Sequence, residues 1–386
     1  MKKIALSVFV VALIAVAGFA GGERDPKAKA PNSKESSNTP KSEAVFVSVE
    51  KGAKWLASVQ GNDGGWGQDG GESSYVRQGE HLESSGNDIA NTAVAVLALR
   101  RAGKEFQPNV ERGLAFILAR VEKSPADGLA LTNMTGTQIQ RKLGPYIDTF
   151  LTSMLLSEVD GTLTDAKLNG RVRVALEKCV AKIQRNQQAD GSWNVGGGWA
   201  PVLGTSMASR SLDVAKQKGV KVEERTMAQA DAYARDAVVA RPVSGVSGGY
   251  AAGSIAAAAP AAAGVALYQN GQALEAMTRT EKDRAKNASK IAEIKSQLTD
   301  QRFVDGFGSM GGEEFFSYLN ISDGLRRTGG EEWTKWHGQI TQKIVALQNN
   351  DGTWAGHHCI TGRVATTSSA MLNLTVDREP LRNARN

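Results

Sequence analysis

Two kinds of helical pattern alternate along the chain. In one kind, apolar residues recur every three or four positions and the opposite face is charged, as over residues 171–185 and 281–295. In the other kind, Ala, Ser, Thr and Gly dominate, as over residues 91–98, 204–211 and 256–266. A charged face suits a helix with one side in solvent, and small side chains suit closely packed inner helices. The pattern therefore predicts an outer and an inner set of helices.

Counting these alternations gives six outer–inner pairs. They cover about residues 44–102, 107–158, 167–218, 224–269, 282–328 and 333–375. Six helical hairpins in a row predict an all-α fold, an α6/α6 toroid, with the small-residue helices inside and the charged helices outside.

A short motif repeats at the ends of the outer helices. Residues 60–66, 187–193 and 348–354 all read Q-x-x-D-G-x-W. Weaker copies stand at residues 247–250 and 304–307, and the spacing places a degenerate copy at 125–136. Asp and Gly favour the turn that ends a helix, and a Trp after the turn can fill the wedge between hairpins. We interpret the repeat as structural.

The inner helices share a second regularity, in which a Thr precedes a Leu by seven residues. Seven residues are about two helical turns, so both side chains lie on one face. The pairs are Thr92 and Leu99, Thr149 and Leu156, Thr205 and Leu212, and Thr367 and Leu374.

These repeats resemble the QW motifs of the prenyltransferase and squalene-cyclase (terpenoid cyclase) superfamily, over nearly all of residues 44–375. The resemblance implies that Gln ends an outer helix and that Trp packs ahead of the next inner helix. The residues that match these structural positions are Gln60, Trp66, Gln187, Trp193, Gln348 and Trp354.

The resemblance also allows the chemistry of the family to be tested. Class II cyclases protonate a polyene with the middle Asp of D-x-D-D-T-A, a use of a carboxyl as general acid. Residues 88–93 here read D-I-A-N-T-A, so Ala90 replaces the proton donor and Asn91 its partner. Asp88 is then expected to cap a helix. Zinc-dependent prenyl transfer is not supported either, because Thr366 stands where the His ligand is expected. We predict no metal and no cofactor.

The inner helices should all point the same way, so that their N-termini meet at one mouth. Free N–H groups and helix dipoles there favour a polar or anionic ligand. The ligand-binding candidates are Asp88, Asn91, Thr92 and Asp148 at helix starts, with His81, His357 and His358 in the neighbouring loops. The sequence His357-His358-Cys359 has metal-ligand types, but three consecutive residues do not suit one ion, and a polar loop is the simpler interpretation. Aromatic candidates for the interior are Tyr146, Phe150, Phe315, Phe316 and Tyr318.

Three functions remain open. The first is an exported, non-cyclising toroid that binds an unidentified small-molecule or protein ligand at its mouth. The second is an enzyme, either a divergent terpenoid cyclase with Asp148 as the acid or a polysaccharide-acting toroid. The third is a purely structural interaction protein. A carboxylate pair inside the toroid would favour the enzyme.

The N-terminus and the composition complete the prediction. Residues 1–20 have the basic start, apolar stretch and small residues of a signal peptide, and 21–42 have the polar composition of a disordered linker. The toroid is expected over 43–378 and a tail over 379–386. This predicts an exported, periplasmic or secreted protein, with membrane contact only if the signal stays uncleaved. The net charge of +6 comes without a Lys/Arg cluster, so nucleic acid is not an expected partner.

Overall fold

The computed structural model describes residues 39–69, 86–194, 201–236, 265–300, 304, 311–357 and 359–378. Those from Lys41 onward belong to one compact unit. Within the described ranges the regular structure is helical, with one isolated antiparallel bridge between Trp66 and Asp88. None of the helices in these ranges is long and apolar enough to span a bilayer. The expected signal peptide, most of the linker and the tail lie outside the described residues, but residues 39–42, expected as linker, are helical.

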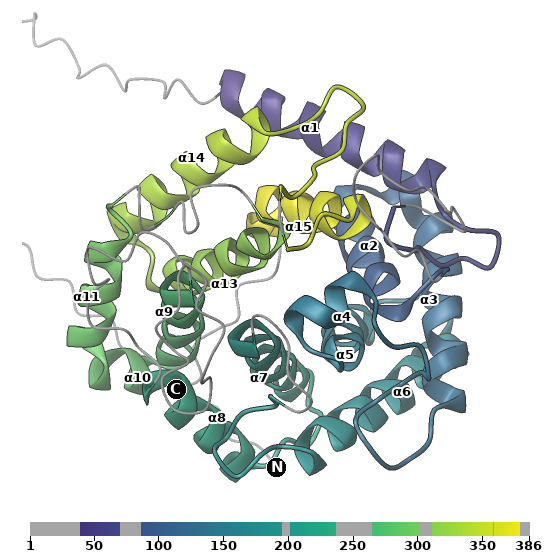
Figure 1. Cartoon of the computed structure of the whole chain (residues 1–386), viewed down its shortest axis with the longest axis horizontal. Coiled ribbons are helices and arrows are strands. Elements are labelled where there is room, and N and C mark those ends of the chain that lie inside the picture. The colour runs from purple at the N-terminus through teal and green to yellow at the C-terminus, as the bar shows by residue number, and fades with distance from the viewer. Residues whose placement is uncertain are drawn as a thin grey trace, which may run out of the picture. The chain divides into compact units, whose positions relative to one another are not determined.

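Six inner helices form a closed ring in this unit (Figure 1). They are α2 (Ile89–Ala102), α5 (Ile147–Val159), α7 (Pro201–Gln217), α9 (Val265–Met277), α13 (Gly312–Thr328) and α15 (Arg363–Leu374). Each packs against the next in this order, and α15 packs against α2. Because the first and last inner helices touch, the ring closes without a free edge.

The outer helices surround this ring (Figure 1). They are α1 (Thr39–Ser58), α3 (Gln107–Lys123), α6 (Ala166–Arg185), α8 (Glu224–Asp236), α10 (Glu281–Lys286) with α11 (Ala288–Gln297), and α14 (Gly330–Ala346). Outer helix α3 buries one stripe that includes Val110, Leu114 and Ile117, whereas inner helix α2 buries every residue from Ile89 to Leu99. The predicted α6/α6 toroid of six hairpins is confirmed.

Some details differ from the prediction. The fourth inner helix, expected over 256–266 and ending near 269, runs to Met277, and residues 237–264 lie outside the described residues. A short helix that the pattern did not indicate, α4 (Gln138–Leu143), precedes α5. Two 3₁₀ turns, Lys104–Phe106 and Val376–Arg378, flank other helices.

The tryptophan of each full repeat is a buried wedge with two fixed hydrogen bonds. The indole Nε1 donates to a carbonyl near the end of its outer helix, and the backbone N–H donates to the Thr Oγ1 of the following inner helix. The indole pairs are Trp66 to Leu56 (2.8 Å), Trp193 to Ile183 (2.7 Å) and Trp354 to Ile344 (2.7 Å). The backbone pairs are Trp66 to Thr92 (2.9 Å), Trp193 to Thr205 (3.2 Å) and Trp354 to Thr367 (3.0 Å). The Thr that recurs near the start of these inner helices therefore anchors the tryptophan of the repeat.

The glutamine of each full repeat links one hairpin to the next. Its Nε2 donates to the glycine carbonyl four residues later and to a carbonyl on the next outer helix. The second acceptor is Asn109 for Gln60 (3.0 Å), Thr226 for Gln187 (2.9 Å) and Ser48 for Gln348 (2.8 Å). Three repeats thus make the same joint in three parts of the toroid.

The degenerate second unit is held in a different way. Between α3 and α5 the chain has no Gln or Trp repeat, and Lys182 of α6 donates to the carbonyls of Asp127, Gly128 and Ala130 at 3.0–3.2 Å. Its side chain is buried, and burial lowers the pKa of its ammonium group. Here the next outer helix supplies the donor that the repeat glutamine supplies elsewhere.

Candidate functional site

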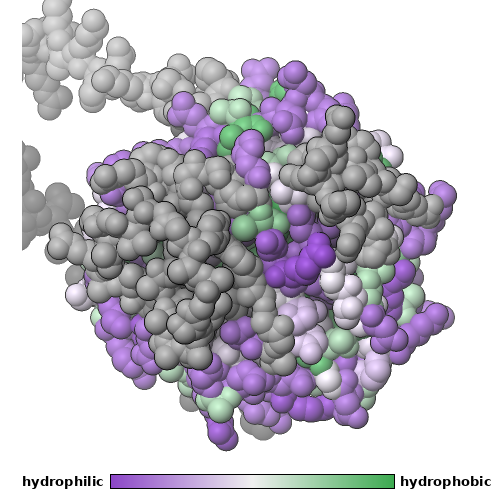
Figure 2. Space-filling view, in the orientation of Figure 1, coloured by the Kyte–Doolittle hydropathy of each residue, from purple (hydrophilic) through white to green (hydrophobic). Residues whose placement is uncertain are grey.

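The mouth of the toroid lies where the inner helices begin. Helix α4 packs there against α2, α5 and α7. It is so close to the first turn of α7 that a Cβ on Gly204 would lie 2.1 Å from the Leu143 carbonyl oxygen. In Figures 1 and 2, α4 lies in front of α5, and hydrophilic residues gather over this part of the face.

The Gln138 side chain of α4 joins the second unit to the last. The Gln138 Oε1 accepts from the backbone N–H groups of Thr361 (3.0 Å) and Gly362 (2.9 Å), and its Nε2 donates to Thr361 Oγ1 (2.8 Å). The Gln68 carbonyl accepts from the Val364 N–H at the start of α15. The rim of the mouth is therefore fixed by hydrogen bonds between units that are far apart in sequence.

Asp88 caps α2, as the sequence predicts. Its Oδ1 accepts from the Asn91 backbone N–H (2.8 Å) and its Oδ2 accepts from Asn91 Nδ2 (2.7 Å). Burial raises the pKa of this carboxyl to about 6, against the opposing effect of the Asn91 hydrogen bonds. Thr92 donates to the Asp88 carbonyl and accepts from Trp66, so its role is structural.

Asp148 lies in the first turn of α5 and is buried. Its Oδ2 accepts from Gln140 Nε2 of α4 at 2.8 Å, whereas its Oδ1 has no hydrogen-bond partner among the described residues. Burial raises the pKa of Asp148 well above its ordinary value, and the negative charge of Asp88 raises it further. Both carboxyls of the pair therefore hold their protons to higher pH than an exposed Asp does. The structure brings together two of the predicted site residues, Asp88 and Asp148.

Gln140 is a site residue that sequence reasoning missed. Besides holding Asp148, it forms a capping box with Thr137: its Oε1 accepts from the Thr137 N–H, and Thr137 Oγ1 accepts from the Gln140 N–H. The capping-box spacing T-x-x-Q at 137–140 was a readable signal for a helix start. Nothing in the sequence linked that helix to Asp148.

A second pair of carboxyls, also missed, begins α13. Glu313 and Glu314 are both fully buried. Burial, and then the charge of Glu313, raise the pKa of Glu314 to about 8. The readable signal was the pair of Glu residues at the start of an inner helix, where α5 carries Asp148. Four buried carboxyls thus lie near the starts of inner helices, and burial raises the pKa of three of them, Asp88, Asp148 and Glu314.

Cys359 lies beside this second pair. Its backbone has a left-handed φ of 56°, unusual for a residue other than glycine. Burial and the adjacent Glu313 carboxyl raise the pKa of the thiol. A raised pKa leaves little thiolate, so this environment does not activate Cys359 as a nucleophile.

Of the three candidate histidines, the structure describes His357 alone. His357 is exposed, and His81 and His358 lie outside the described residues. The parts of the chain that the structure describes contain no group of three His, Cys, Asp or Glu side chains placed to hold a metal ion.

The expectation for one aromatic residue is wrong. The Tyr318 hydroxyl donates to the Val304 carbonyl (2.9 Å), and its ring packs edge-on against Trp336 of outer helix α14, at 5.8 Å between centroids. Tyr318 therefore points out of the inner ring rather than into it. Phe150, Phe315 and Phe316 are buried and Tyr146 is half-buried.

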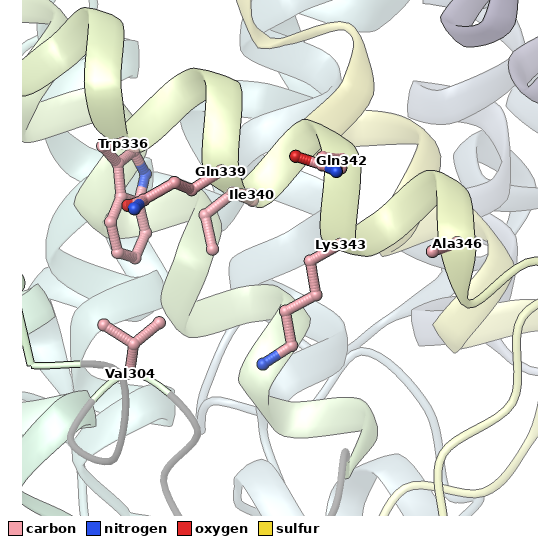
Figure 3. Close-up of a pocket in the computed structure, with 7 residues that line it drawn as sticks. All are labelled: Val304, Trp336, Gln339, Ile340, Gln342, Lys343 and Ala346. Carbon is pink, nitrogen blue, oxygen red and sulfur yellow. The ribbon is translucent and has the colours of Figure 1, made fainter.

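A pocket of about 400 Å³ lies on α14. Figure 3 shows Trp336, Ile340 and Lys343 on the side of α14 that faces Val304. Of the lining residues, Lys343 alone is charged, and its Nζ lies 5.6 Å from the centre of the Tyr318 ring. This pocket holds none of the carboxyls described above.

Comparisons with known proteins agree with this architecture. Residues 36–142 match the model of the squalene-hopene cyclase C-terminal domain. The chain is 41% identical over 71 residues to squalene–hopene cyclase of Bradyrhizobium diazoefficiens and 36% identical over 69 residues to a probable squalene–hopene cyclase of Sinorhizobium fredii. Each match spans 18% of this chain and 10% of the relative.

The fold is also similar to that of a solved structure. The type II terpene cyclase MstE from Scytonema, in complex with geranylgeranyl dihydroxybenzoate, superposes with a TM-score of 0.53 and 10% sequence identity, over 87% of this chain and 98% of that chain. At this identity the likeness concerns the fold alone. Together with the sequence matches and the three equivalent repeat joints, it supports the resemblance to the squalene-cyclase superfamily, whose α/α toroid fold this chain shares.

Proposed function

We propose that this chain is a ligand-binding toroid that has lost the cyclase acid, and that its ligand binds at the mouth beside Asp148. The observation that carries the proposal is the Asp148 carboxyl, which is buried and has one oxygen without a hydrogen-bond partner among the described residues. A buried polar atom left unmatched costs about 1–3 kcal/mol. A bound polar group would remove that cost.

The electrostatics of the pair suggest how the ligand is held. Burial raises the pKa of both carboxyls, and the charge of Asp88 raises the pKa of Asp148 further. A neutral carboxyl is both donor and acceptor, whereas Asp88 is occupied by Asn91. Asp148 in its protonated form is thus the group that meets the ligand.

Binding can be tested by thermal shift with farnesol, geranylgeraniol, glucose and myo-inositol as probes. We expect at least one probe to raise the Tm of the wild type at pH 6.5, and Asp148→Leu to abolish that shift. Asp165→Asn is a matched control, because Asp165 caps outer helix α6 at an exposed position. A wild type that binds none of the probes, or an Asp148→Leu variant that binds as well, would refute the proposal.

A second candidate is an enzyme in which Asp148 is the general acid. The Asp88–Asp148 pair favours it, because two coupled carboxyls with raised pKa values resemble known acid sites. Against it, Ala90 stands at the donor position and cannot release a proton. We expect no cyclised product from squalene. A product that Asp148→Asn abolishes would establish the enzyme instead.

Export is part of the first proposal. It is supported by the signal-like residues 1–20 and the polar composition of residues 21–38. Fractionation of cells that express the full chain, with a Lys2→Glu, Lys3→Glu double variant as control, tests it. We expect processed wild-type protein outside the inner membrane and retention of the variant.

A further inference from the structure

An ion-pair network links α7, α9 and α13 toward the C-terminal ends of these helices. We call this network the floor of the ring. Arg279 bonds Glu275 at 2.6 Å, and Arg327 approaches Glu275 at 3.3 Å and also bonds Asp323. Arg210 of α7 lies 3.7 Å from Asp323 of α13. Their side chains are at most 6% exposed. Each arginine of this floor lies within 3.7 Å of a carboxylate, and Arg279 also bonds Asp231 of outer helix α8.

A neutral layer lies directly above the floor. Asn320 of α13 donates to Ser206 Oγ of α7 at 2.7 Å and accepts from Arg210 at 3.5 Å. Helices α7 and α13 are separated in the ring order by α9, so these side chains meet on the inner side of α9. Polar side chains therefore reach the middle of the ring at this level.

The same part of the ring contains a buried amide without hydrogen-bond partners. Gln272 of α9 is 1% exposed, and neither its Oε1 nor its Nε2 has a hydrogen-bond partner in the described parts of the chain. Gln269 Oε1 and Ser317 Oγ are also buried without a hydrogen-bond partner in these parts of the chain. A Cβ on Gly271 would lie 3.5 Å from the Ser317 carbonyl, which places Ser317 level with this part of α9.

Helical spacing puts Gln272 on the inner face of α9. It follows Tyr268 by four residues and precedes Glu275 by three, so the three side chains share a stripe. Glu275 lies in the floor, and Tyr268 lies near Glu313, Glu314 and Cys359, whose negative charges, after burial itself, raise the pKa of its hydroxyl. Gln272 is therefore between the mouth cluster and the floor.

We propose that this middle level binds a small neutral molecule rich in hydroxyl groups, a cyclic polyol or monosaccharide. The inference rests on the proposed function and names the substrate class of the same ring interior. The amide oxygen needs a donor, the amide nitrogen needs an acceptor, and Ser317 can be either. A hydroxyl supplies both roles, whereas a hydrocarbon supplies neither.

Charge also favours a neutral ligand. The floor pairs its arginines with carboxylates, and the mouth above carries Asp88, Asp148, Glu313 and Glu314. Asp88 ionises above about pH 6, so an anion would meet its charge at the mouth, and the arginines of the floor are already paired with carboxylates. Of the polar or anionic ligands expected from the helix dipoles, this favours the neutral polar ones.

The test is isothermal titration of the purified, processed chain with myo-inositol and glucose, and with farnesol as the apolar probe. Gln272→Met removes the amide while keeping the side chain's length, and Gln188→Met makes the same change at an exposed turn. We expect wild type and Gln188→Met to bind at least one hydroxylated probe, and Gln272→Met to bind it at least tenfold more weakly. The Gln272→Met variant without ligand should have a higher Tm, since an unmatched amide has been replaced by an apolar group.

Each other outcome overturns the inference. If farnesol binds in an Asp148-dependent way and Gln272→Met leaves binding unchanged, the mouth proposal stands and the polyol proposal falls. If neither hydroxylated probe binds, or if a crystal soaked with them shows only water on Gln272 and Ser317, the middle level is merely hydrated. A change in Gln188→Met equal to that in Gln272→Met would show that the effect does not come from the ring interior.

Discussion

Gln348 Nε2 donates to the carbonyl of Ser48 at 2.8 Å, across 300 residues of sequence. This bond joins the end of α14 to α1 and so closes the outer layer of the toroid. The same side chain also holds its own turn through the Gly352 carbonyl at 2.9 Å. The joint copies those of Gln60 and Gln187, which connect neighbouring hairpins inside the chain.

Replacement of Gln348 should therefore weaken ring closure. Gln348→Leu leaves two carbonyls without their donor, and we expect a loss of about 1–3 kcal/mol in the free energy of unfolding. Gln187→Leu breaks an equivalent joint and should cost a similar amount. Gln188→Leu, one position along at an exposed site, is the control for urea denaturation. An unchanged midpoint for Gln348→Leu would show that the joint does not stabilise the fold.

The turn glycine of the repeat is needed for two separable reasons. Gly191 has a φ of +89°, and a Cβ there would lie 2.3 Å from the Gln229 carbonyl of α8. Gly219 has a φ of +76° with nothing within 4 Å. Gly219→Ala should cost only the strain of the left-handed backbone, about 1 kcal/mol. Gly191→Ala should cost clearly more, about 3 kcal/mol, because the turn must also move away from α8. Equal losses in thermal denaturation would exclude the clash.

We expect Lys182 of outer helix α6 to contribute as much to the stability of the fold as a repeat tryptophan does. Lys182→Met removes three hydrogen bonds from the 127–130 loop and leaves their carbonyls unmatched. Charge-assisted bonds are the stronger kind, so we expect a loss of about 2–3 kcal/mol and faster hydrogen exchange in that loop. Lys167→Met, at an exposed position early in the same helix, is the control. Unchanged exchange at 127–130 would contradict the role of Lys182.

Much of the fold could be read from the sequence because the repeat is local. Gln187, the D-G turn and Trp193 lie within seven residues, so one segment contains most of a joint, and three copies fix the period. The prediction went wrong where the repeat fades: α9 extends to Met277, and the second unit uses Lys182 from a different helix. A donor supplied from 52–55 residues away has no sequence signature.

The site was harder to predict for a related reason. Asp148 could be singled out because it starts an inner helix, and Asp88 because it stands in a recognisable motif. Gln140 and Gln272 could not, because an amide has no distinctive motif and its meaning depends on what surrounds it. The buried Asp88–Asp148 pair comes from the ring that brings α2 against α5, a contact between helices that local patterns do not encode.

The carboxyl pair predicts how stability depends on pH. Burial raises the pKa of Asp88 from 3.8 to about 6 in the folded chain. The folded state then binds the proton more tightly than the unfolded state, so Asp88's contribution to stability is full below about pH 4 and is lost as the pH rises through about 6. At 1.36 kcal/mol per pKa unit, the loss from this group is at most about 3 kcal/mol. Asp88→Asn keeps the helix cap but cannot ionise, so the variant should match the wild type near pH 4 and exceed it in urea stability at pH 7.5. Asp165→Asn, the same change at the exposed cap of α6, should give no such divergence. If the curves for Asp88→Asn and the wild type run parallel from pH 4 to 7.5, Asp88 is not the buried, proton-binding partner of Asp148 that the mouth requires.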